Sequence, residues 1–420
     1  MSNRLAGIDL WDPDSYANGP PHEMFTRLRR EAPVYWHEEP DGPGFWVVSK
    51  FADVQALSRD WETFSSERGG TEITDYPEAE LELLRMLPLY MDPPKHTRYR
   101  MLVNKAFTPR TVRTMTSRIE RIAQEIVDDI SERGECDFIS AVAARLPLAV
   151  IAEMIGIPVA DRGRVVDWSN RIVGWMDPEF AAQRSDATQA SMEMLQYASE
   201  LAEQKRQRPG DDLTTELVNA EIEHDGETAK LSELEIGLFF LLLAIAGNET
   251  TRNLISQGML AFIEHPEQWS KLRADPGLMD TAIEEMLRWA TPTMHFRRTA
   301  MRDYELRGQR IHEGAKVTLW YISANRDEEK FEQPFTFDIL RRPNEHLAFG
   351  GGGPHFCFGS HLARLEIAAL FRQLVHRIPE IQVHGEIRRL RSNFANAIKE
   401  MPVQFASVAA PGDLVSSREG

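Results

Sequence analysis

The sequence has little cysteine and little positive charge for its length. Its 420 residues include only Cys136 and Cys357, which is too few for a disulfide framework. Lys and Arg number 48 against 65 Asp and Glu, and the formal net charge of -17 argues against nucleic acid or anionic membrane as a partner. The start of the chain has neither a basic flank before an apolar stretch nor a small-residue cleavage site. We therefore expect a cytoplasmic protein with both thiols reduced.

The sequence also lacks a long hydrophobic run and any obvious linker. Its most apolar stretch, Ile236 to Gly247 (IGLFFLLLAIAG), is well short of the ~18 apolar residues that suggest a membrane span. This stretch predicts a buried core helix and no membrane anchor. Because no internal repeat, low-complexity block or Ser/Gly linker interrupts the chain, we expect residues 1–420 to form one domain.

Helical patterns dominate what is present, especially from Thr97 to Ile263. The expected helices are Phe51 to Ser58, Arg110 to Glu132, Ala141 to Ile155, one on each side of Trp175 to Phe180, Ser232 to Glu264, Leu278 to Trp289, and Leu362 to His376. Short strands are expected at Phe45 to Ser49, within Tyr304 to Leu319, and within Ile381 to Phe405. The predicted fold is mainly α with a minor β portion: a single large helical domain with short sheets near the N-terminus and in the C-terminal third. The connection Trp175 to Phe180 is expected to be mobile and to act as a lid.

The segment Phe349 to Gly359 (FGGGGPHFCFG) carries the most unusual chemistry. Four consecutive glycines allow positive φ angles and a close approach to a flat ligand. Cys357 lies just before a predicted helix, where backbone N–H groups and the helix dipole stabilise a thiolate, as an axial iron ligand requires. A phosphate-binding loop is the alternative, although the Lys-Ser/Thr ending and the strand-helix-strand unit of nucleotide loops are absent. The loop alone leaves both readings open.

The segment Ala246 to Thr251 (AGNETT) places polar groups inside the most apolar helix. Burial of Glu249 and Thr250 there is costly unless both are paired, so their presence needs a reason. Thr250 can donate to the carbonyl of Ala246, and Gly247 leaves space beside the backbone for a small ligand. This arrangement suits dioxygen and a chain of waters. A solvated helix end or a harmless kink explains the segment equally well.

Two further pairs have weaker signals. Glu285 and Arg288 are three residues apart and share a helix face, as many exposed ion pairs do. His96 and Arg100 are one turn apart and can present two donors to one anion, although such basic turns are common. Neither pair identifies a function by itself.

Taken in order, the segments MDPPKHTRYR, AGNETT, EEMLR, FRRTA, RRPNEHLAFG and GGGGPHFCFG resemble those of a bacterial cytochrome P-450 over nearly the whole chain. The resemblance implies a haem-thiolate monooxygenase that binds haem b, with Cys357 as the axial ligand of the haem iron. It also implies that Glu285 and Arg288 join with Arg341 to brace the fold beneath the haem. The implied haem-binding residues are His96, Arg100, Ala246, Arg298, Phe349, Gly350, His355, Cys357 and Gly359, of which His96, Arg100, Arg298 and His355 would hold the propionates.

One departure from the common family pattern narrows the resemblance. Because of an extra glycine, Phe349 lies one residue further from Cys357 than is usual. This loop, AGNETTRN, and SNFANAIKEMPV (Ser392 to Val403) are similar to an actinobacterial-type subgroup that hydroxylates sterol side chains and methyl-branched lipids. The resemblance implies an apolar substrate such as a sterol, a branched lipid or a terpenoid-like molecule.

The implied reaction assigns roles to further residues. Glu249 and Thr250 would deliver protons to dioxygen bound at the iron, while the Cys357 thiolate would donate electron density. Leu242, Ile245, Ala246, Thr293, Met294, Phe394 and Ala395 are expected to face the substrate, although each would serve equally well as plain core.

The resemblance also implies an electron donor. The two electrons would come from an iron-sulfur ferredoxin with its flavin-dependent reductase, since the chain carries no reductase-like extension. Arg98, Arg341, Arg342 and Arg364 would receive the acidic ferredoxin, unless they are solvated or occupied by internal ion pairs.

Two other functions share the same loop. One is a peroxygenase that uses hydrogen peroxide without a redox partner, and the other is a non-catalytic haem sensor or carrier. The pair Glu249 and Thr250 counts against both, because neither function needs proton delivery at the distal face of the haem.

Overall fold

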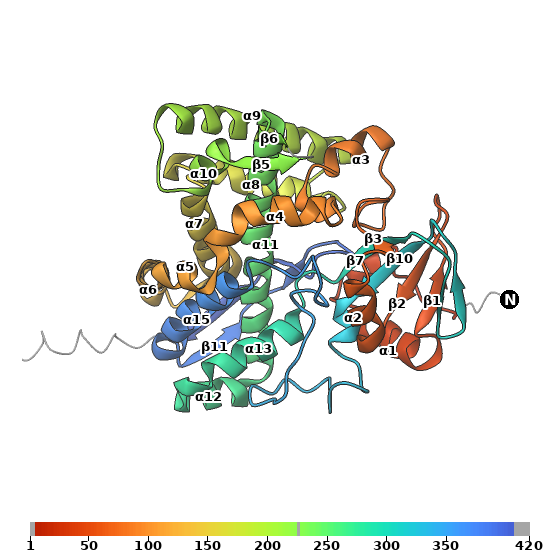
Figure 1. Ribbon diagram of the computed structural model, residues 1–420. Helices are drawn as coiled ribbons and strands as arrows, with labels where there is room; N and C mark the ends of the chain where they lie inside the picture. Colours follow the sequence, from red (N-terminus) through yellow and green to blue (C-terminus); the bar gives the residue numbers. More distant parts are fainter. Residues whose placement is uncertain (1–4, 225–226, 407–420) are drawn as a thin grey trace, which may run out of the picture.

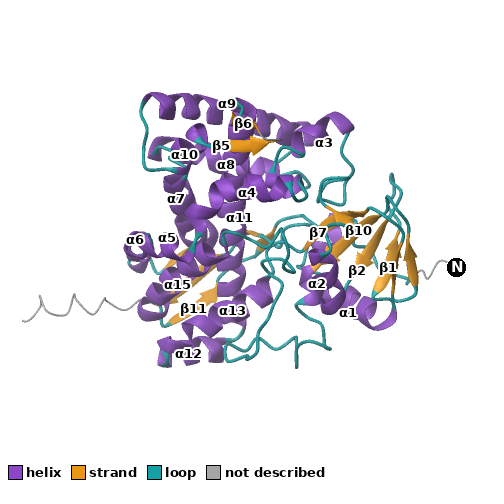
Figure 2. Cartoon of the chain, viewed as in Figure 1, coloured by secondary structure: helices purple, strands orange, loops and turns teal. Residues whose placement is uncertain are grey.

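The computed structural model describes residues 5–224 and 227–406, and it is mainly helical with several small sheets (Figures 1 and 2). The helices are α1 (His22–Glu31), α2 (Phe51–Arg59), α3 (Glu78–Leu84), α4 (Lys95–Asn104), α5 (Pro109–Thr114), α6 (Thr116–Ser131), α7 (Arg145–Met154), α8 (Arg162–Val173), α9 (Arg184–Gln207), α10 (Leu213–Asn219), α11 (Glu233–Glu264), α12 (Pro266–Ala274), α13 (Met279–Ala290), α14 (Tyr321–Ala324) and α15 (Ser360–Arg377). The predicted fold class, mainly α with a minor β portion, is confirmed.

The strands form one five-stranded sheet and four smaller ones. They are β1 (Val34–His37), β2 (Phe45–Val48), β3 (Phe64–Ser65), β4 (Glu135–Asp137), β5 (Glu221–His224), β6 (Glu227–Lys230), β7 (His295–Ala300), β8 (Tyr304–Leu306), β9 (Gln309–Ile311), β10 (Lys316–Trp320), β11 (Glu380–Val383), β12 (Arg388–Arg389), β13 (Ile398–Glu400) and β14 (Pro402–Ala406). The large sheet has the order β1-β2-β10-β7-β3, with β2 and β10 parallel and its other pairs antiparallel. It therefore joins the N-terminal strands to the C-terminal third of the chain.

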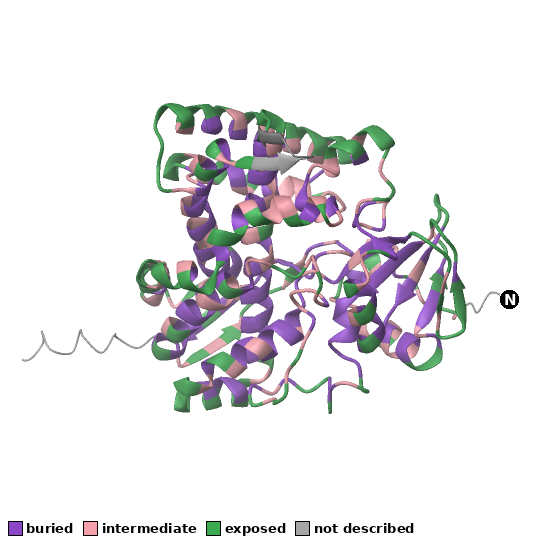
Figure 3. Ribbon diagram, viewed as in Figure 1, coloured by how far each residue is buried: buried purple, intermediate pink, exposed green. Residues whose placement is uncertain are grey.

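Helix α11 runs through the centre of the helical part, as Figure 1 shows. It begins with a capping box, in which Ser232 and Glu235 each satisfy the other's backbone N–H, and it ends before Pro266. Most of its residues are buried (Figure 3), and it packs against α7, α9 and α13. In the described part of the chain it is the one helix long and apolar enough to cross a membrane, but these contacts are those of a core helix.

Several expected helices begin or break where the sequence pattern did not indicate it. The helix expected at Arg110 to Glu132 is two helices, α5 and α6, which meet at Met115. The helix expected at Ala141 to Ile155 starts with a π-helical segment, Ile139–Ala143, followed by α7. Helix α1, strand β7 and helix α10 were not expected, because short elements stabilised by tertiary packing have weak local patterns.

The connection between α8 and α9 is tethered rather than loose. Asp177, at its centre, is 2% exposed and accepts a hydrogen bond from Lys399 Nζ at 2.7 Å. The backbone N–H of Arg391 donates to the same carboxylate at 3.1 Å. The expected mobile lid at Trp175 to Phe180 is therefore anchored to the C-terminal strands, because a buried carboxylate needs these partners.

Candidate active site

A cavity lies between α11 and the loop that precedes α15. Its walls also include residues of α4, α13, β7 and α14. All of the residues predicted to bind haem line it: His96, Arg100, Ala246, Arg298, Phe349, Gly350, His355, Cys357 and Gly359. The fold thus brings together segments that are more than 250 residues apart in the sequence.

The Cys357 thiol faces this cavity from just before α15, which begins at Ser360. Its side chain has accessible surface only because it borders the cavity, since the surrounding protein encloses it. Burial raises the pKa of the Cys357 thiol, while the backbone N–H of Gly359 and the guanidinium groups of Arg100 and Arg364 oppose that rise. These groups are placed to stabilise the Cys357 thiolate when it binds a metal ion.

The glycine run supports the loop in a different way from the one expected. Of the four glycines, only Gly350 lines the cavity. A Cβ on Gly351 would meet Ser58 and come within 3.1 Å of Gln55 Cα, both on α2. Gly352 and Gly353 have φ angles of +94° and +75°, which favour glycine. Most of the run therefore lets the loop turn and pack against α2, not against a flat ligand.

Four basic side chains, called the cationic cluster below, meet at one end of the cavity: His96, Arg100, Arg298 and His355. The His96 and His355 rings lie 4.5 Å apart, and His96 Nδ1 has no protein partner. Burial, together with Arg100 and Arg298, lowers the pKa of His96 to about 4. Within the described residues neither arginine has a carboxylate ion pair, and their hydrogen bonds go to the carbonyls of Pro354 and Arg297.

This set of donors fits haem b. A cationic cluster without carboxylate partners suits two propionates, and a thiol flanked by a backbone N–H suits ferric iron. Cys357 would hold the iron, and the cluster would hold the propionates.

Thr250 and Glu249 are neighbours on α11 but face different surroundings. Thr250 lines the cavity and donates from Oγ1 to the carbonyl of Ala246 at 2.7 Å, as the sequence suggested. Glu249 is buried away from the cavity, where it forms an ion pair with Arg252, which in turn donates to Asn170 on α8 at 3.0 Å. Burial raises the pKa of Glu249 despite the opposing effect of Arg252.

Gly247 has a packing role that the sequence reading missed. A Cβ on Gly247 would lie 2.9 Å from Ile151 Cδ1 on α7. The missing side chain therefore allows α7 to approach α11, and Gly247 also borders the cavity, as expected from the sequence.

Six further residues that were expected to face the substrate lie in different places. Leu242 and Thr293 line the cavity. Ile245 points to another face of α11, since the lining residues of that helix recur every three or four positions. The structure places the remaining three in the core: Met294 among the residues around Trp320, and Phe394 and Ala395 beside Phe180.

Glu366 lines the cavity and was not identified from the sequence. It is 2% exposed, and its Oε2 has no hydrogen-bond partner. Burial raises its pKa well above the ordinary value. It shares a face of α15 with Leu362 and Ala363, which also line the cavity, and this spacing was the available signal.

Apolar residues from four segments form a continuous part of the cavity lining, called the apolar wall below. They are Pro88, Leu89, Phe239, Leu242, Leu243, Pro292 and Phe296. Pro88 and Leu89 belong to a short 3-10 helix, Pro88–Tyr90, that the sequence did not indicate.

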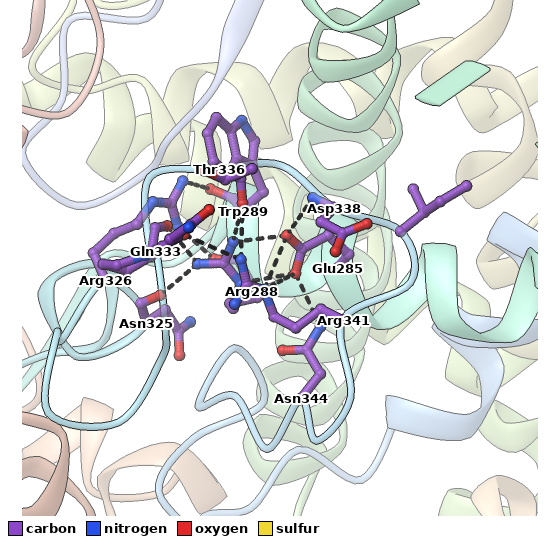
Figure 4. A network of polar contacts seen from close by, with 12 residues as sticks. Glu285, Arg288, Trp289, Asn325, Arg326, Gln333, Thr336, Asp338, Arg341 and Asn344 are labelled. Atoms are coloured by element: carbon purple, nitrogen blue, oxygen red, sulfur yellow. Dashed lines mark hydrogen bonds and ion pairs between the residues drawn. The ribbon is translucent and has the colours of Figure 1, made fainter. Parts of the chain in front are cut away.

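Glu285 and Arg288 form the centre of a buried polar network (Figure 4). Both side chains are 0% exposed and make two hydrogen bonds to each other, at 2.7 and 2.8 Å. Arg341 Nε lies 3.2 Å from the Glu285 carboxylate, as predicted, and Arg288 also donates to the carbonyls of Asn325 and Pro334. The pair is therefore not an exposed ion pair, and it links α13 to the segment that precedes the Cys357 loop.

Two of the four arginines proposed to face a ferredoxin are bound within the chain. Arg341 belongs to the Glu285 network, and Arg364 donates two hydrogen bonds to Glu284, at 2.5 and 2.8 Å. Arg342 is exposed, and Arg98 is partly buried. The internal ion pairs that the sequence left open as an alternative are therefore present for Arg341 and Arg364.

Comparisons with known proteins agree with this geometry. The family model of cytochrome P450 matches residues 159–379. A steroid C26-monooxygenase of Rhodococcus jostii is 42% identical over 97% of this chain and 86% of that protein. A methyl-branched lipid omega-hydroxylase of Mycobacterium bovis is 42% identical over 96% of this chain and 94% of that protein.

A solved structure extends the similarity to three dimensions. A Mycobacterium marinum cytochrome P450 in complex with pseudoionone superposes with a TM-score of 0.88 at 42% identity, covering 96% of this chain and 100% of that one. The fold, the cavity and these relatives lead to one conclusion: the chain belongs to the cytochrome P450 family and is a haem b monooxygenase that uses dioxygen to hydroxylate an apolar substrate.

Proposed function

We propose that this enzyme hydroxylates the terminal carbon of a branched aliphatic chain, on a sterol side chain or a methyl-branched lipid. The observation that carries the proposal is that relatives with 42% identity over almost the whole chain are named for attack at such a terminus, at steroid C26 or at the omega position. The apolar wall supports it, because a hydrocarbon chain gains from burial against Leu89, Phe239 and Leu242.

In this proposal Cys357 would hold the haem iron, and the cationic cluster would hold the propionates. When bound, haem supplies the activation of dioxygen, and the thiolate assists it by donating electron density. Ala246, Phe349, Gly350 and Gly359 line the cavity and would contact the macrocycle. The apolar wall excludes water and determines which C–H bond faces the iron.

Thr250 and Glu249 are the proposed route for protons. The Thr250 hydroxyl is held by the Ala246 carbonyl, so its lone pairs remain available toward the cavity. Glu249 is one residue away on the far side of α11, in a buried pair with Arg252 that continues to Asn170. We assign Glu249 the transfer of protons from the α8 side of the molecule toward Thr250.

The electron donor in this proposal is an iron-sulfur ferredoxin with its flavin-dependent reductase, in the cytoplasm. Arg342, which is exposed, is the candidate contact for the acidic donor, because Arg341 and Arg364 are already paired. The Glu285, Arg288 and Arg341 network braces the segment beneath the cavity. We further propose that residues 1–420 form one domain.

The experiment that tests the substrate uses the purified holoenzyme with a surrogate ferredoxin and reductase. The compounds are a sterol with an intact side chain, a methyl-branched lipid and a small aromatic. We expect the sterol and the methyl-branched lipid to shift the haem spin state. Both should give products hydroxylated at the chain terminus, identified by mass spectrometry. A spin-state response to the small aromatic alone, or hydroxylation only on the sterol rings, would contradict the proposal.

A further inference from the structure

The apolar wall contains no charged side chain. Within the described part of the chain, the basic residues of the whole cavity lining are His96, Arg100, Arg298 and His355, and all four belong to the cationic cluster. The acidic residue of the lining is Glu366, which lies on α15, on the same side of the cavity as Cys357. A substrate held against the apolar wall therefore meets no basic group other than those assigned to the propionates.

The segment that carries Pro88 and Leu89 is strongly acidic. Residues 67–90 contain six acids, Glu67, Glu72, Asp75, Glu78, Glu80 and Glu82, against two bases, Arg68 and Arg85. Arg85 is already engaged, since it donates to Glu78 at 2.5 Å and to the carbonyl of Glu67 at 2.9 Å. Asp75 in turn pairs with Arg297 at 2.8 Å and with Lys316 at 2.7 Å, so these two cations are occupied by the protein and are not available to a substrate carboxylate.

The neighbouring connection between α8 and α9 offers no free cation either. Residues 174–183 contain no lysine or arginine, and their two acids, Asp177 and Glu179, both pair with Lys399, at 2.7 and 2.9 Å. Arg184, which follows them, joins the two segments: it pairs with Glu80 at 3.4 Å and lies over the rings of Tyr76 and Trp175. This guanidinium is therefore occupied by the protein itself.

Two phenols, Tyr76 and Tyr90, lie at this end of the apolar wall. Tyr90 packs with Leu89 and Leu242, and its hydroxyl and that of Tyr76 interact with the Glu72 carboxyl. Burial raises the pKa of Glu72, and the two phenols oppose the rise. Phenols suit a hydroxyl, ketone or ester oxygen, whereas a carboxylate would need a cation.

We infer that the apolar wall accepts substrates that are uncharged along their buried length, and that it excludes ionised carboxylates. The class selected is neutral sterols and the esters or alcohols of branched lipids, and free fatty acids are disfavoured. The physical reason is that a buried carboxylate without a cationic partner loses its hydration and gains nothing in return. The inference rests on the proposed function only in that the substrate carries a long aliphatic chain.

The test compares two compounds that differ only in charge. A methyl-branched fatty acid and its methyl ester are titrated into the holoenzyme at pH 8, where the free acid is ionised, and Kd is taken from the haem spin-state shift. We expect the ester to bind at least tenfold more tightly than the acid. Equal affinities, or tighter binding of the acid, would overturn the inference.

A matched pair of variants locates the effect. Leu89→Arg places a cation in the apolar wall, and Leu83→Arg places one nearby on α3, at a side chain that is 49% exposed. We expect Leu89→Arg to tighten binding of the acid and weaken that of the ester by several-fold, with Leu83→Arg close to wild type. Equal gains for the acid in both variants would show that the wall is not the origin of the selectivity.

The comparison of acid and ester does not depend on the variants folding, and the carbon monoxide spectrum of each variant checks that haem is bound normally. Failure of the proposed function is distinguishable from failure of this inference. If a neutral sterol binds but is oxidised on a ring, the proposed position of attack is wrong and the charge selectivity stands. An aromatic acid and its ester are compared in the same way. The preference for neutral compounds can then be measured even if the aliphatic compounds do not bind.

Discussion

At the scale of single residues, the orientation of two neighbours on α11 separates their proposed roles. Thr250 faces the cavity with its hydroxyl held by the Ala246 carbonyl, and Glu249 is buried on the other side with Arg252. Successive residues of a helix differ by about 100° in direction, and Glu249 falls outside the face of α11 that lines the cavity. In the proposed proton route, the acid would therefore act on the cavity through Thr250 or through solvent, not by direct contact.

The first prediction concerns Thr250→Ala. This variant should retain haem and bind substrate normally, because the side chain contributes no packing that alanine cannot replace. Product per NADH consumed should fall roughly tenfold or more, with hydrogen peroxide released instead, because proton delivery is lost. The measurement is the ratio of product and peroxide to NADH.

Ser256→Ala is the matched control for that prediction. Ser256 is on the same helix and donates to the Arg252 carbonyl at 2.7 Å, but it does not line the cavity. It should couple electrons to product like the wild type. Equal uncoupling in both variants would assign the effect to the helix backbone and not to the Thr250 hydroxyl.

At the scale of elements, acidic side chains in the middle of α13 link this helix to its surroundings. Glu285 binds Arg288 and Arg341, and Glu284 accepts hydrogen bonds from Arg364 on α15 and from His346. Burial raises the pKa of Glu284, but Arg364 and His346 outweigh it and lower the pKa to about 2. These contacts hold α13, α15 and the segment before the Cys357 loop in one arrangement.

The second prediction follows from the depressed pKa of Glu284. A carboxylate with a lower pKa in the folded state stabilises the fold above its unfolded value, which is 4.5, and loses that contribution as the pH falls toward 2. Glu284→Gln should lower the free energy of unfolding by about 1–2 kcal/mol at neutral pH, after allowance for partial exposure. Thermal unfolding of both proteins from pH 7 down to pH 3 should show the difference shrinking below pH 4.5.

Glu345→Gln provides the comparison, because Glu345 pairs with Lys330 at the surface. Its thermal stability should change little at any pH. A difference for Glu284→Gln that stays constant from pH 7 to pH 3 would mean that its contacts do not depend on the carboxylate charge.

At the scale of the whole molecule, a net charge of -17 opposes the binding of an acidic redox partner. Docking then depends on basic residues that remain available near the segment before the Cys357 loop. Arg341 and Arg364 are engaged within the fold, whereas Arg342 next to them in sequence is exposed. Arg342 is therefore a better candidate for a contact with the redox partner than the four arginines taken together.

The third prediction is that Arg342→Glu slows electron transfer from the ferredoxin. The rate of haem reduction under carbon monoxide, followed by stopped flow, should fall several-fold at low ionic strength, and the difference should narrow as salt screens the charges. Arg208→Glu makes the same charge change at the exposed C-cap of α9 and should have little effect; α9 is the helix at the top of Figure 1. Equal slowing in both variants would indicate an effect of net charge alone.

Much of the fold follows from local signals. The capping box at Ser232, the Pro266 stop and the apolar run between them define α11 within a residue or two. Thr108 accepts from the Thr111 N–H and starts α5 as its sequence suggests. The break at Met115 and the strand β7 were not predicted, because both depend on contacts with distant segments.

The sequence by itself determined which chemical groups are available and in what order: a cysteine before a helix, basic residues spread over 260 positions, and an acid beside an alcohol in an apolar helix. Only the tertiary structure decided which way they point. Glu249 lies away from the cavity, whereas Glu366 lines it. Arg364 pairs with Glu284, and Gly351 packs against α2. The physical reason is that residue type and spacing set the face of a helix, whereas the partner that covers this face is chosen by the packing of elements far apart in the chain.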